Sequence, residues 1–313
     1  MIPTVSKRSA GVARAHAVVV SWEGKGLLPS CLSTLGDFEA VWVVDNGSTD
    51  GTVAMLARDF PAVRVIESLL NLGYGRANNL ALRRALDDGA DFVALINNDV
   101  ELESGWLAAM LEAADSCKHA GLFAGTLLFR GEERVNSTGL SIDAFGRARD
   151  RDFGVERAQL RREDGPVQGV SGGAALLRAS MLREIGLFDP AYFAYYEDVD
   201  LSLRAARFGY GSRYVGAAIA RHRFGATFGP GSPRQRYLLG RGHLRTLALH
   251  QPLWKAAALV PMTAAYRLAV KAPLELLRAR PALAWAELRA AGAGSWTAVQ
   301  AVLQRLARSN QRR

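Results

Sequence analysis

Three groups of polar residues in this chain have the types and spacing of a site that binds phosphate and moves a proton. Two groups directly follow apolar, β-branched runs, and the third stands where a helical pattern begins. The residues are Asp45 and Asn46, then Asn97, Asn98 and Asp99, and finally Glu197, Asp198 and Asp200. Carboxylate and amide oxygens suit a hard divalent cation, and a carboxylate can accept the proton of an attacking hydroxyl.

The first two groups suit the binding of a nucleotide. Asp45 can accept a hydrogen bond from the imide N–H of a uracil or thymine ring. Asp99 and the two amides before it stand where a divalent cation could bridge two phosphates. Simpler alternatives remain open for both groups. Asp45 also begins a well-capped turn before a helix, and an isolated Asn-x-Asp is a common turn.

The third group has more acid than a helix start requires. Glu197, Asp198 and Asp200 are carboxylates within four residues of one another, whereas capping and the helix macrodipole account for one. The excess favours a general base that deprotonates an acceptor hydroxyl, with an over-acidic, solvated helix start as the alternative. His222 follows the apolar run Ala217–Ala220 and is either a nitrogen ligand for the metal or a structural histidine.

A segment rich in glycine and amides opens the helix that precedes the Asn97–Asp99 group. It runs from Asn71 to Asn79 and includes Arg76. Small residues, amides and one guanidinium near a helix N-terminus suit contact with a nucleotide. A glycine-rich turn is weak evidence alone, so this segment only supports the other groups.

These residues need a scaffold that brings the ends of strands together. Four β-branched runs alternate with helical patterns in the first half of the chain, at Ala17–Val20, Val41–Val44, Val63–Ile66 and Phe92–Ile96. This alternation predicts an α/β fold with a mostly parallel sheet covered by helices on both faces. Ligands of such sheets bind beyond the carboxyl ends of the strands, where the first two polar groups stand.

The pattern changes in the second half of the chain. It predicts a hairpin-like strand at Leu122–Phe129, a mobile polar loop at Arg147–Asp164, a helix at Asp198–Phe208 and a strand near Arg213–Val215. Beyond His250 the sequence is rich in Ala, Leu and Arg and is predicted to be helical. We expect breaks in that helix at Pro252, Pro261, Pro273 and Pro281.

Composition and missing motifs exclude several classes of protein. Cys31 and Cys117 lack the spacing of a metal knuckle or a disulfide framework, which favours a reducing compartment. With no signal-peptide pattern and no run of about 18 apolar residues, we expect a cytoplasmic protein without a transmembrane helix. The first strand is followed only by Gly24–Gly26, not by the glycine-rich loop of a Rossmann dehydrogenase or a sugar nucleotidyltransferase. No nucleic-acid-binding motif accompanies the net charge of +9.

Six motifs together are more specific than any one of them. They are V-D-N-G-S-T-D-G, N-L-G-Y-G-R-A-N-N, I-N-N-D-V, S-G-G-A-A-L-L-R, G-L-F-D-P and F-A-Y-Y-E-D-V-D-L-S-L-R. In their order and spacing the chain resembles the glycosyltransferase family two group, in particular its bacterial rhamnosyltransferase-like branch. The resemblance extends from about Ala17 to Arg245.

The resemblance implies a GT-A fold and an inverting, metal-dependent glycosyltransferase. Asp45 would contact the donor base, and Asp99 would fill the last position of the D-x-D metal motif, completed by His222. Asp198 would be the catalytic base, with Glu197 as the second catalytic carboxylate. Other implied residues are Asn46, Asn71, Arg76, Asn97, Asn98, Tyr237 and Arg241 for the donor, the last two at its pyrophosphate, and Gly172, Gly173 and Glu197 for the acceptor. The first D-x-D position is Asn97, which leaves open whether Mg²⁺ or Mn²⁺ is bound.

The resemblance also implies the partners and the division of the chain. The donor would be a dTDP- or UDP-linked sugar, with rhamnose favoured, and the acceptor a glycan or lipid-linked molecule in cell-surface polysaccharide synthesis. We expect an N-terminal extension (1–16), a catalytic domain (17–250) with a donor-binding half (17–121) and an acceptor-binding half (122–250), and a helical tail (251–313). The alternative is a catalytically inactive scaffold of the same fold that binds nucleotide sugars.

The tail carries nearly all of the net charge. From residue 251 onward, ten basic residues stand against two acidic ones, Glu275 and Glu287. Trp254, Trp285 and Trp296 lie among them in interrupted helical patterns. This composition predicts a peripheral anchor on the anionic inner face of the plasma membrane. The alternative is an appendage that packs on the catalytic domain or forms a homo-oligomer interface.

Overall fold

A ten-stranded mixed sheet forms the centre of the protein in a computed structural model, which describes residues 13–225, 229 and 231–310. Most of the predicted N-terminal extension and the end of the predicted tail therefore lie outside the described residues. The strand β1 (Ala15–Ser21) lies parallel to β2 (Ala40–Asp45) and β4 (Phe92–Asn97), and β2 lies parallel to β3 (Arg64–Glu67). The four strands predicted in the first half are confirmed.

The second half of the chain adds both parallel and antiparallel strands to the sheet. β11 (Ala174–Arg178) lies antiparallel between β4 and β6 (Ala120–Phe129), and β12 (Gly211–His222) runs parallel to β6. β12 is longer than the predicted strand at Arg213–Val215, because its pairing with β6 resumes after a shift in register. The shorter strands are β5 (Val100–Leu102), β7 (Val135–Ser137), β8 (Leu140–Ile142), β9 (Ala148–Asp150) and β10 (Gly165–Val167).

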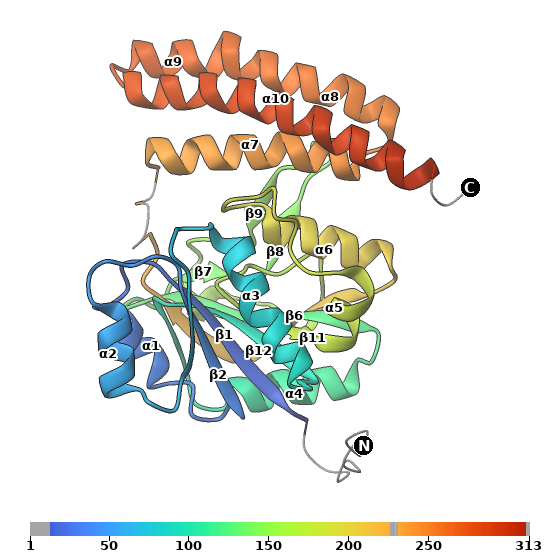
Figure 1. Cartoon of the computed structure of the whole chain (residues 1–313). Coiled ribbons are helices and arrows are strands. Elements are labelled where there is room, and N and C mark those ends of the chain that lie inside the picture. The colour runs from blue at the N-terminus through green and yellow to red at the C-terminus, as the bar shows by residue number, and fades with distance from the viewer. Residues whose placement is uncertain (1–12, 226–228, 230, 311–313) are drawn as a thin grey trace, which may run out of the picture.

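Helices cover both faces of the sheet (Figure 1). Successive residues of β1 point to opposite faces, so Val19 belongs to one apolar core and Val18 to the other. The helices on the Val19 side are α1 (Leu28–Leu32), α2 (Thr52–Asp59) and α4 (Trp106–Ser116). Those on the Val18 side are α3 (Tyr74–Asp87), α5 (Ala179–Ile185) and α6 (Glu197–Arg207). We call the sheet with these helices the α/β body.

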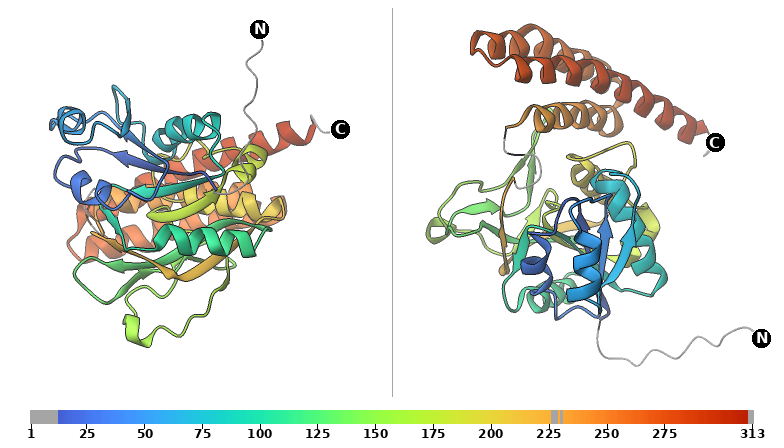
Figure 2. Two further views of the ribbon diagram at one scale, coloured as in Figure 1. Left: turned by 90° about the horizontal axis from the view of Figure 1, so that it is seen from below. Right: turned by 60° about the vertical axis from the view of Figure 1, so that its left-hand side comes forward.

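A further set of helices lies beyond the α/β body. α7 (Pro233–His250) packs against the body, and α8 (Leu253–Tyr266), α9 (Ala272–Leu277) and α10 (Pro281–Asn310) lie on the outer side of α7 (Figures 1 and 2). We call α8, α9, α10 and the π-helical turn between α8 and α9 the helical layer. The boundary expected after His250 falls between α7 and α8.

Two of the four predicted helix breaks are wrong. Pro252 precedes α8 and Pro281 begins α10, but Pro261 lies inside α8 and Pro273 lies within a continuous helical run. The π-helical turn at Arg267–Lys271 comes just before Pro273. Pro273 lies in the first turn of α9, where a residue has no hydrogen-bond acceptor four residues earlier within that helix, so the missing N–H of proline costs little.

The helical layer has small residues inside and large apolar residues outside. The side of α10 that faces α7 carries Ala290 and Ala301, both fully buried, and Gly294, where a Cβ would lie 2.5 Å from a methyl carbon of Leu244. Large apolar side chains are instead exposed on the outside of the layer. We call them the outer face: Leu253, Trp254, Met262, Tyr266, Leu268, Val270, Leu274, Leu276, Leu277, Trp285, Leu288, Trp296, Val299 and Leu303. Exposed apolar surface on this scale marks an interaction site.

Charged side chains occupy part of the interior of the layer. Glu287 on α10 is fully buried and forms ion pairs with Arg267 and, at 3.2 Å, with Arg236 of α7. Glu275 is buried as well, so both acidic residues of the tail are removed from the surface. The exposed charges of the helical layer are therefore basic among the described side chains. Within the same part of the chain, no helix combines the length and apolarity needed to cross a membrane.

Candidate functional site

One cleft of about 300 Å³ collects most of the predicted site residues. It lies at the carboxyl ends of the parallel strands, where Asn97 ends β4, and it extends to the start of α6. The predicted residues that line it are Asn46, Asn71, Asn97, Asn98, Asp99, Gly172, Gly173, Glu197, Asp198 and His222. Asp45, Arg76, Tyr237 and Arg241 are not in its lining.

Asp45 ends β2 behind the wall of the cleft and is buried. Its Oδ2 accepts a hydrogen bond from the Ser48 N–H at 3.1 Å, whereas Oδ1 has no hydrogen-bond partner among the described residues. Leaving a buried carboxylate oxygen without a donor is costly, and the imide N–H of a bound base would satisfy it. Arg76 is exposed on α3 outside the cleft.

Asn46 and Asn71 hold the loop that forms one side of the cleft. The Oδ1 of Asn46 accepts from the Leu72 N–H at 2.8 Å, and its Nδ2 donates to the Oδ1 of Asn71 at 3.1 Å. The same Asn71 oxygen accepts from the Gly73 N–H at 2.9 Å. The two amides therefore fix the turn ahead of α3. The Nδ2 of Asn98 donates a hydrogen bond to the Ser21 hydroxyl at 3.1 Å.

The predicted metal ligands are brought together by a three-residue strand. β5 follows Asp99 and pairs antiparallel with β12, which places Val100 opposite His222. His222 Nε2 lies 3.2 Å from Asp99 Oδ1, and its Nδ1 lies 2.8 Å from Asn136 Oδ1. The amide oxygen of Asn136 favours a proton on Nδ1, which leaves a lone pair on Nε2 facing the carboxylate. A cation between these two atoms would interact favourably with both.

The spacing of this pair fits a shared divalent cation. Ligands at adjacent corners of an octahedron, each about 2.1 Å from the metal, are about 3 Å apart. No group of three or more His, Cys, Asp or Glu side chains in the described chain is arranged to hold a metal. Two protein ligands leave coordination positions for phosphate oxygens and water, which is how Mg²⁺ is usually held at nucleotide sites.

Two consecutive residues in the left-handed conformation precede the catalytic candidates. Tyr195 and Tyr196 have φ angles of 65° and 73°, which non-glycine residues rarely adopt. Gly242 of α7 lies against them, because a Cβ there would be 2.9 Å from the Tyr195 carbonyl oxygen and from the Tyr196 Cβ. The ring of His243 lies 5.7 Å from that of Tyr196, and burial lowers the pKa of His243 to about 4, so the imidazole is neutral. α7 thus holds the strained turn in place.

Asp198 is the carboxylate best placed to accept a proton. Its Oδ2 accepts from the Gly172 N–H at 3.1 Å and its Oδ1 from the Val199 N–H at 2.8 Å. Burial raises the pKa of Asp198, and the two backbone donors oppose this rise. Glu197 is buried with one oxygen unpartnered, and burial together with the charge of Asp198 raises its pKa well above the ordinary value. Asp198 therefore ionises first.

The sequence analysis missed two residues of the cleft, Asn136 on β7 and Asp150 on β9. Asn136 orients His222, and its Nδ2 is buried without a partner in the described structure. Burial raises the pKa of Asp150 to about 6; the Ser137 hydroxyl opposes the rise and the charge of Asp198 adds to it. Both residues lie on three-residue strands, which are too short for a periodic pattern to reveal.

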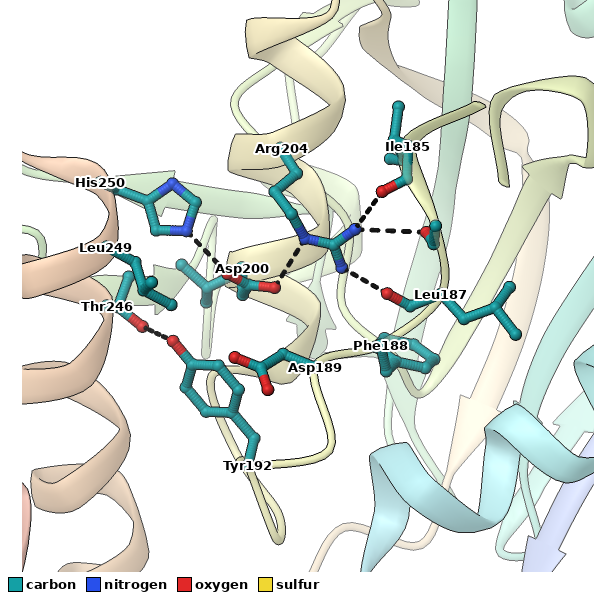
Figure 3. Close-up of polar contacts among 12 residues, drawn as sticks. Ile185, Leu187, Phe188, Asp189, Tyr192, Asp200, Arg204, Thr246, Leu249 and His250 are labelled. Carbon is teal, nitrogen blue, oxygen red and sulfur yellow. Dashed lines mark hydrogen bonds and ion pairs between the residues drawn. The ribbon is translucent and has the colours of Figure 1, made fainter. Parts of the chain in front are cut away.

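Asp200, the last carboxylate of the acidic group, has a structural role. Its Oδ1 lies 2.7 Å from His250 Nε2, and its Oδ2 accepts from Arg204 Nε at 2.9 Å (Figure 3). Burial opposes its ionisation, but His250 and Arg204 outweigh burial and lower the pKa of Asp200. Arg204 also donates to the carbonyls of Ile185 and Leu187. Asp200 thus ties α6 to the end of α7.

Comparison with known proteins decides the family. Residues 22–186 match the family described as Glycosyl transferase family 2, and residues 118–288 match Glycosyl transferase family group 2. The chain belongs to glycosyl transferase family 2. The family predicted from the six motifs is therefore confirmed.

Curated relatives place this family 2 chain near the rhamnosyltransferases. It is 32% identical over 203 residues to an N-acetylglucosaminyl-diphospho-decaprenol L-rhamnosyltransferase of Mycobacterium tuberculosis, covering 58% of this chain and 66% of the relative. It is 29% identical over 164 residues to the rhamnosyltransferase WbbL of Escherichia coli K12, covering 48% and 60%. The chain thus spans just under two thirds of the length of these relatives.

A solved structure supports the fold. The mannosyltransferase PcManGT from Pyrobaculum calidifontis, in complex with GDP-Man and Mn²⁺, matches at a TM-score of 0.57 and 18% identity, over 92% of this chain and 88% of that one. The predicted α/β fold of GT-A type, with helices at its C-terminal end, is confirmed.

Two residues predicted to bind the donor lie elsewhere in this family 2 chain. Tyr237 and Arg241 are on α7 and line a second cavity rather than the cleft. Arg241 donates to the Ala191 carbonyl at 2.9 Å. These positions do not support contact with a donor pyrophosphate beside Asp99, so that role stays a prediction.

The buried state of Glu197 predicts a pH-dependent gain in stability for Glu197→Gln. The raised pKa of Glu197 means that the folded chain retains a proton that the unfolded chain releases above about pH 4.3. The free energy of unfolding contributed by this group therefore falls as pH rises from that value toward the folded pKa. In thermal unfolding from pH 4 to pH 8, the melting temperature of the Gln variant should rise relative to that of the unmodified chain. Glu112→Gln, at an exposed site on α4, is the control, and an equal gain at every pH would contradict the assignment.

Proposed function

We propose that this protein is an inverting glycosyltransferase that moves a sugar from a nucleoside diphosphate sugar to a hydroxyl of its acceptor. One observation carries the proposal: a single cleft contains the Asp99–His222 pair, suited to a metal-bound diphosphate, and the Asp198 carboxylate, suited to a hydroxyl proton. Membership of glycosyl transferase family 2 supports the same conclusion. The acceptor oxygen forms a bond to the anomeric carbon as the bond to the diphosphate breaks, which inverts that carbon.

The donor is proposed to be a dTDP- or UDP-linked sugar. The unpartnered Oδ1 of Asp45 suits the imide N–H of uracil or thymine. Adenine has no ring N–H at the corresponding position, and guanine has an amino group beside its ring N–H. Similarity to the two rhamnosyltransferases supports rhamnose as the sugar. The name of the mycobacterial relative supports an acceptor sugar that is linked to a lipid through a diphosphate.

Asp99 and His222 are proposed to hold a divalent cation, with Asn136 as the residue that orients His222. When bound, the cation would neutralise charge that develops on the departing diphosphate. Asp198 takes the proton of the attacking hydroxyl, and Glu197, kept protonated by its surroundings, leaves Asp198 as the ionised member of the carboxyl pair that lines the cleft at the start of α6. No covalent intermediate with the protein is required.

An inactive nucleotide-sugar-binding scaffold is the alternative, and the cost of the site argues against it. Burying Glu197 and Asp198 without a cationic partner among the described residues destabilises the fold, and so does each left-handed tyrosine, by about 1–3 kcal/mol. A scaffold that only bound a nucleotide sugar would gain nothing from these features. Catalysis makes use of both, since they hold a carboxylate of raised pKa in a fixed direction.

We also propose that the outer face of the helical layer lies on an anionic membrane. Large apolar side chains point outward, the exposed charges among the described residues are basic, and both tail carboxylates are buried. Each basic residue near an anionic leaflet contributes about 1 kcal/mol. A second copy of the chain would cover the apolar side chains but would set two basic surfaces against each other. The cytoplasmic leaflet, which carries the anionic lipids, is the proposed location.

Asp198→Asn should lower kcat by about 100-fold or more while leaving donor affinity unchanged, because the variant loses only the proton acceptor. The kcat of the unmodified protein should fall as pH drops through the raised pKa of Asp198, since only the ionised form accepts a proton. That fall should be absent in the Asn variant. Steady-state kinetics and calorimetric donor binding measure both effects. Normal turnover in Asp198→Asn with an inactive Glu197→Gln would assign the base to Glu197.

Removal of the cation should abolish turnover. The affinity for Mn²⁺ should depend on Asp99, His222 and Asn136. In paramagnetic-resonance titrations with a nucleoside diphosphate present, we expect no tight Mn²⁺ binding by Asp99→Ala. Asn136→Ala should bind about 10-fold more weakly, because it loses only the group that orients His222. Asp115→Asn, exposed on α4, should bind normally. Full activity in excess chelator would rule out the metal site.

Liposome flotation tests the membrane contact. The full chain should float with anionic vesicles at low salt, and less with neutral vesicles or at high salt. Replacing Leu276 and Leu277 of the outer face by Glu should reduce flotation by about 10-fold or more. Arg83→Glu with Arg84→Glu changes twice as much charge on α3 of the α/β body and should still float. A full chain that never floats, or that dimerises through Leu276 and Leu277 instead, would contradict the proposal.

A further inference from the structure

A second cavity lies between the first half of α7 and the first half of α10. It has a volume of about 560 Å³, and three arginines line it: Arg234 and Arg241 from α7 and Arg289 from α10. Its other side chains include Tyr237 and Trp285. The sequence analysis gave no reason to expect an arginine from α10 beside two from α7, because the pairing of these helices is not visible in the chain.

Aromatic rings and a backbone carbonyl contact the arginines of this cavity. The guanidinium of Arg289 stacks 4.7 Å from the ring of Tyr237, and that of Arg234 lies 5.5 Å from the ring of Phe193. Arg241 donates to a backbone carbonyl. In the described part of the chain, no carboxylate forms an ion pair with Arg241 or Arg289. Their charge is therefore available to an anion.

The carboxylate of α10 that is nearest to Arg289 does not neutralise the cavity. Glu287 stands two residues before Arg289, yet it is fully buried in ion pairs with Arg236 and Arg267 on the other side of the helix. Arg236 and Arg267 are neutralised by Glu287, whereas Arg241 and Arg289 have no ion pair with a carboxylate in the described part of the chain. Guanidinium groups in this state suit a phosphate, which they bind through charge-assisted and often bidentate hydrogen bonds.

The cavity connects the two regions to which function has been proposed. Phe193 lines both the cavity and the catalytic cleft. Trp285 lines the cavity and, at 61% exposure, is also part of the outer face. A molecule with its sugar in the cleft and its apolar chain along the outer face would therefore pass the arginines.

We propose that this cavity binds the phosphate or diphosphate group of a lipid-linked acceptor. The inference rests on the proposed glycosyl transfer and assigns Arg241 and Arg289 to the acceptor rather than to the donor pyrophosphate. The arginines bind the phosphate oxygens, Trp285 contacts the first part of the apolar chain, and the sugar on the other side of the phosphate extends past Phe193 toward Asp198.

Binding of farnesyl diphosphate by calorimetry tests the site without any knowledge of the sugar. Farnesol, which lacks the phosphates, and inorganic pyrophosphate, which lacks the chain, separate the two parts of the ligand. We expect Arg241→Ala with Arg289→Ala to weaken farnesyl diphosphate about 10-fold or more and to leave farnesol unchanged. Trp285→Ser should weaken farnesyl diphosphate but not pyrophosphate. Arg83→Ala on α3 is the control for charge loss and should bind as the unmodified chain does.

Binding of UDP with Mn²⁺, measured on the same variants, keeps the tests distinct. The arginine variants should bind UDP normally, which also shows that they are folded. A loss of UDP affinity equal to that for farnesyl diphosphate would return Arg241 to the donor site and overturn the proposal. Farnesyl diphosphate affinity within twofold of the unmodified chain would overturn it as well. Failure of the proposed glycosyl transfer would appear instead as no sugar transfer from dTDP- or UDP-linked donors by the unmodified chain, which the farnesyl diphosphate titration does not report.

Discussion

The contact between α6 and α7 is the constraint on which the rest of the structure depends. Just before α6, Gly242 lets α7 approach the left-handed pair Tyr195–Tyr196. At the end of α7, His250 binds Asp200 of α6 at 2.7 Å. These two contacts fix both the turn that precedes the proposed catalytic carboxylates and the helix that follows it. The strain of the tyrosine turn persists because α7 is held against it, so a side chain larger than hydrogen at position 242 would redirect Asp198.

The same helix carries the outer layer, and a buried arginine couples the two. Arg245 of α7 is 1% exposed and donates to Asp189 at 2.6 Å, to the Thr297 carbonyl at 3.2 Å and to Gln304 at 3.0 Å. Asp189 belongs to the loop ahead of α6, and the other two partners belong to α10. Removing one partner of a buried charge costs about 3–5 kcal/mol, so the cleft and the helical layer do not move independently at low cost.

The sequence predicted what depends on local pattern and missed what depends on pairing between distant segments. The four parallel strands follow from their β-branched runs, and Asp99 and Asp198 follow from polar residues at strand and helix ends. His222 could be proposed as a ligand but not placed, because β5, the strand that aligns it with Asp99, has only three residues. Asn136 and Asp150 lie on equally short strands and left no signal. Composition predicted the basic, apolar tail, but its burial of small residues and exposure of large ones emerges only when α10 is packed on α7.

The cleft carries mainly carboxylates and the cavity carries arginines. This difference in charge suggests how the proposed donor and acceptor could be directed to separate sites. The cleft gathers Asp99, Asp150 and Asp198, and its field repels a diphosphate unless a cation enters with it. The cavity presents Arg241 and Arg289 without carboxylate partners among the described residues, which would favour a diphosphate that brings no cation. In the proposed reaction, a donor diphosphate with its metal would be directed to Asp99, and an acceptor diphosphate to the arginines. The acceptor sugar, being neutral, can then occupy the acidic side of Phe193, where its hydroxyl meets the one ionised carboxylate of α6 that faces the cleft.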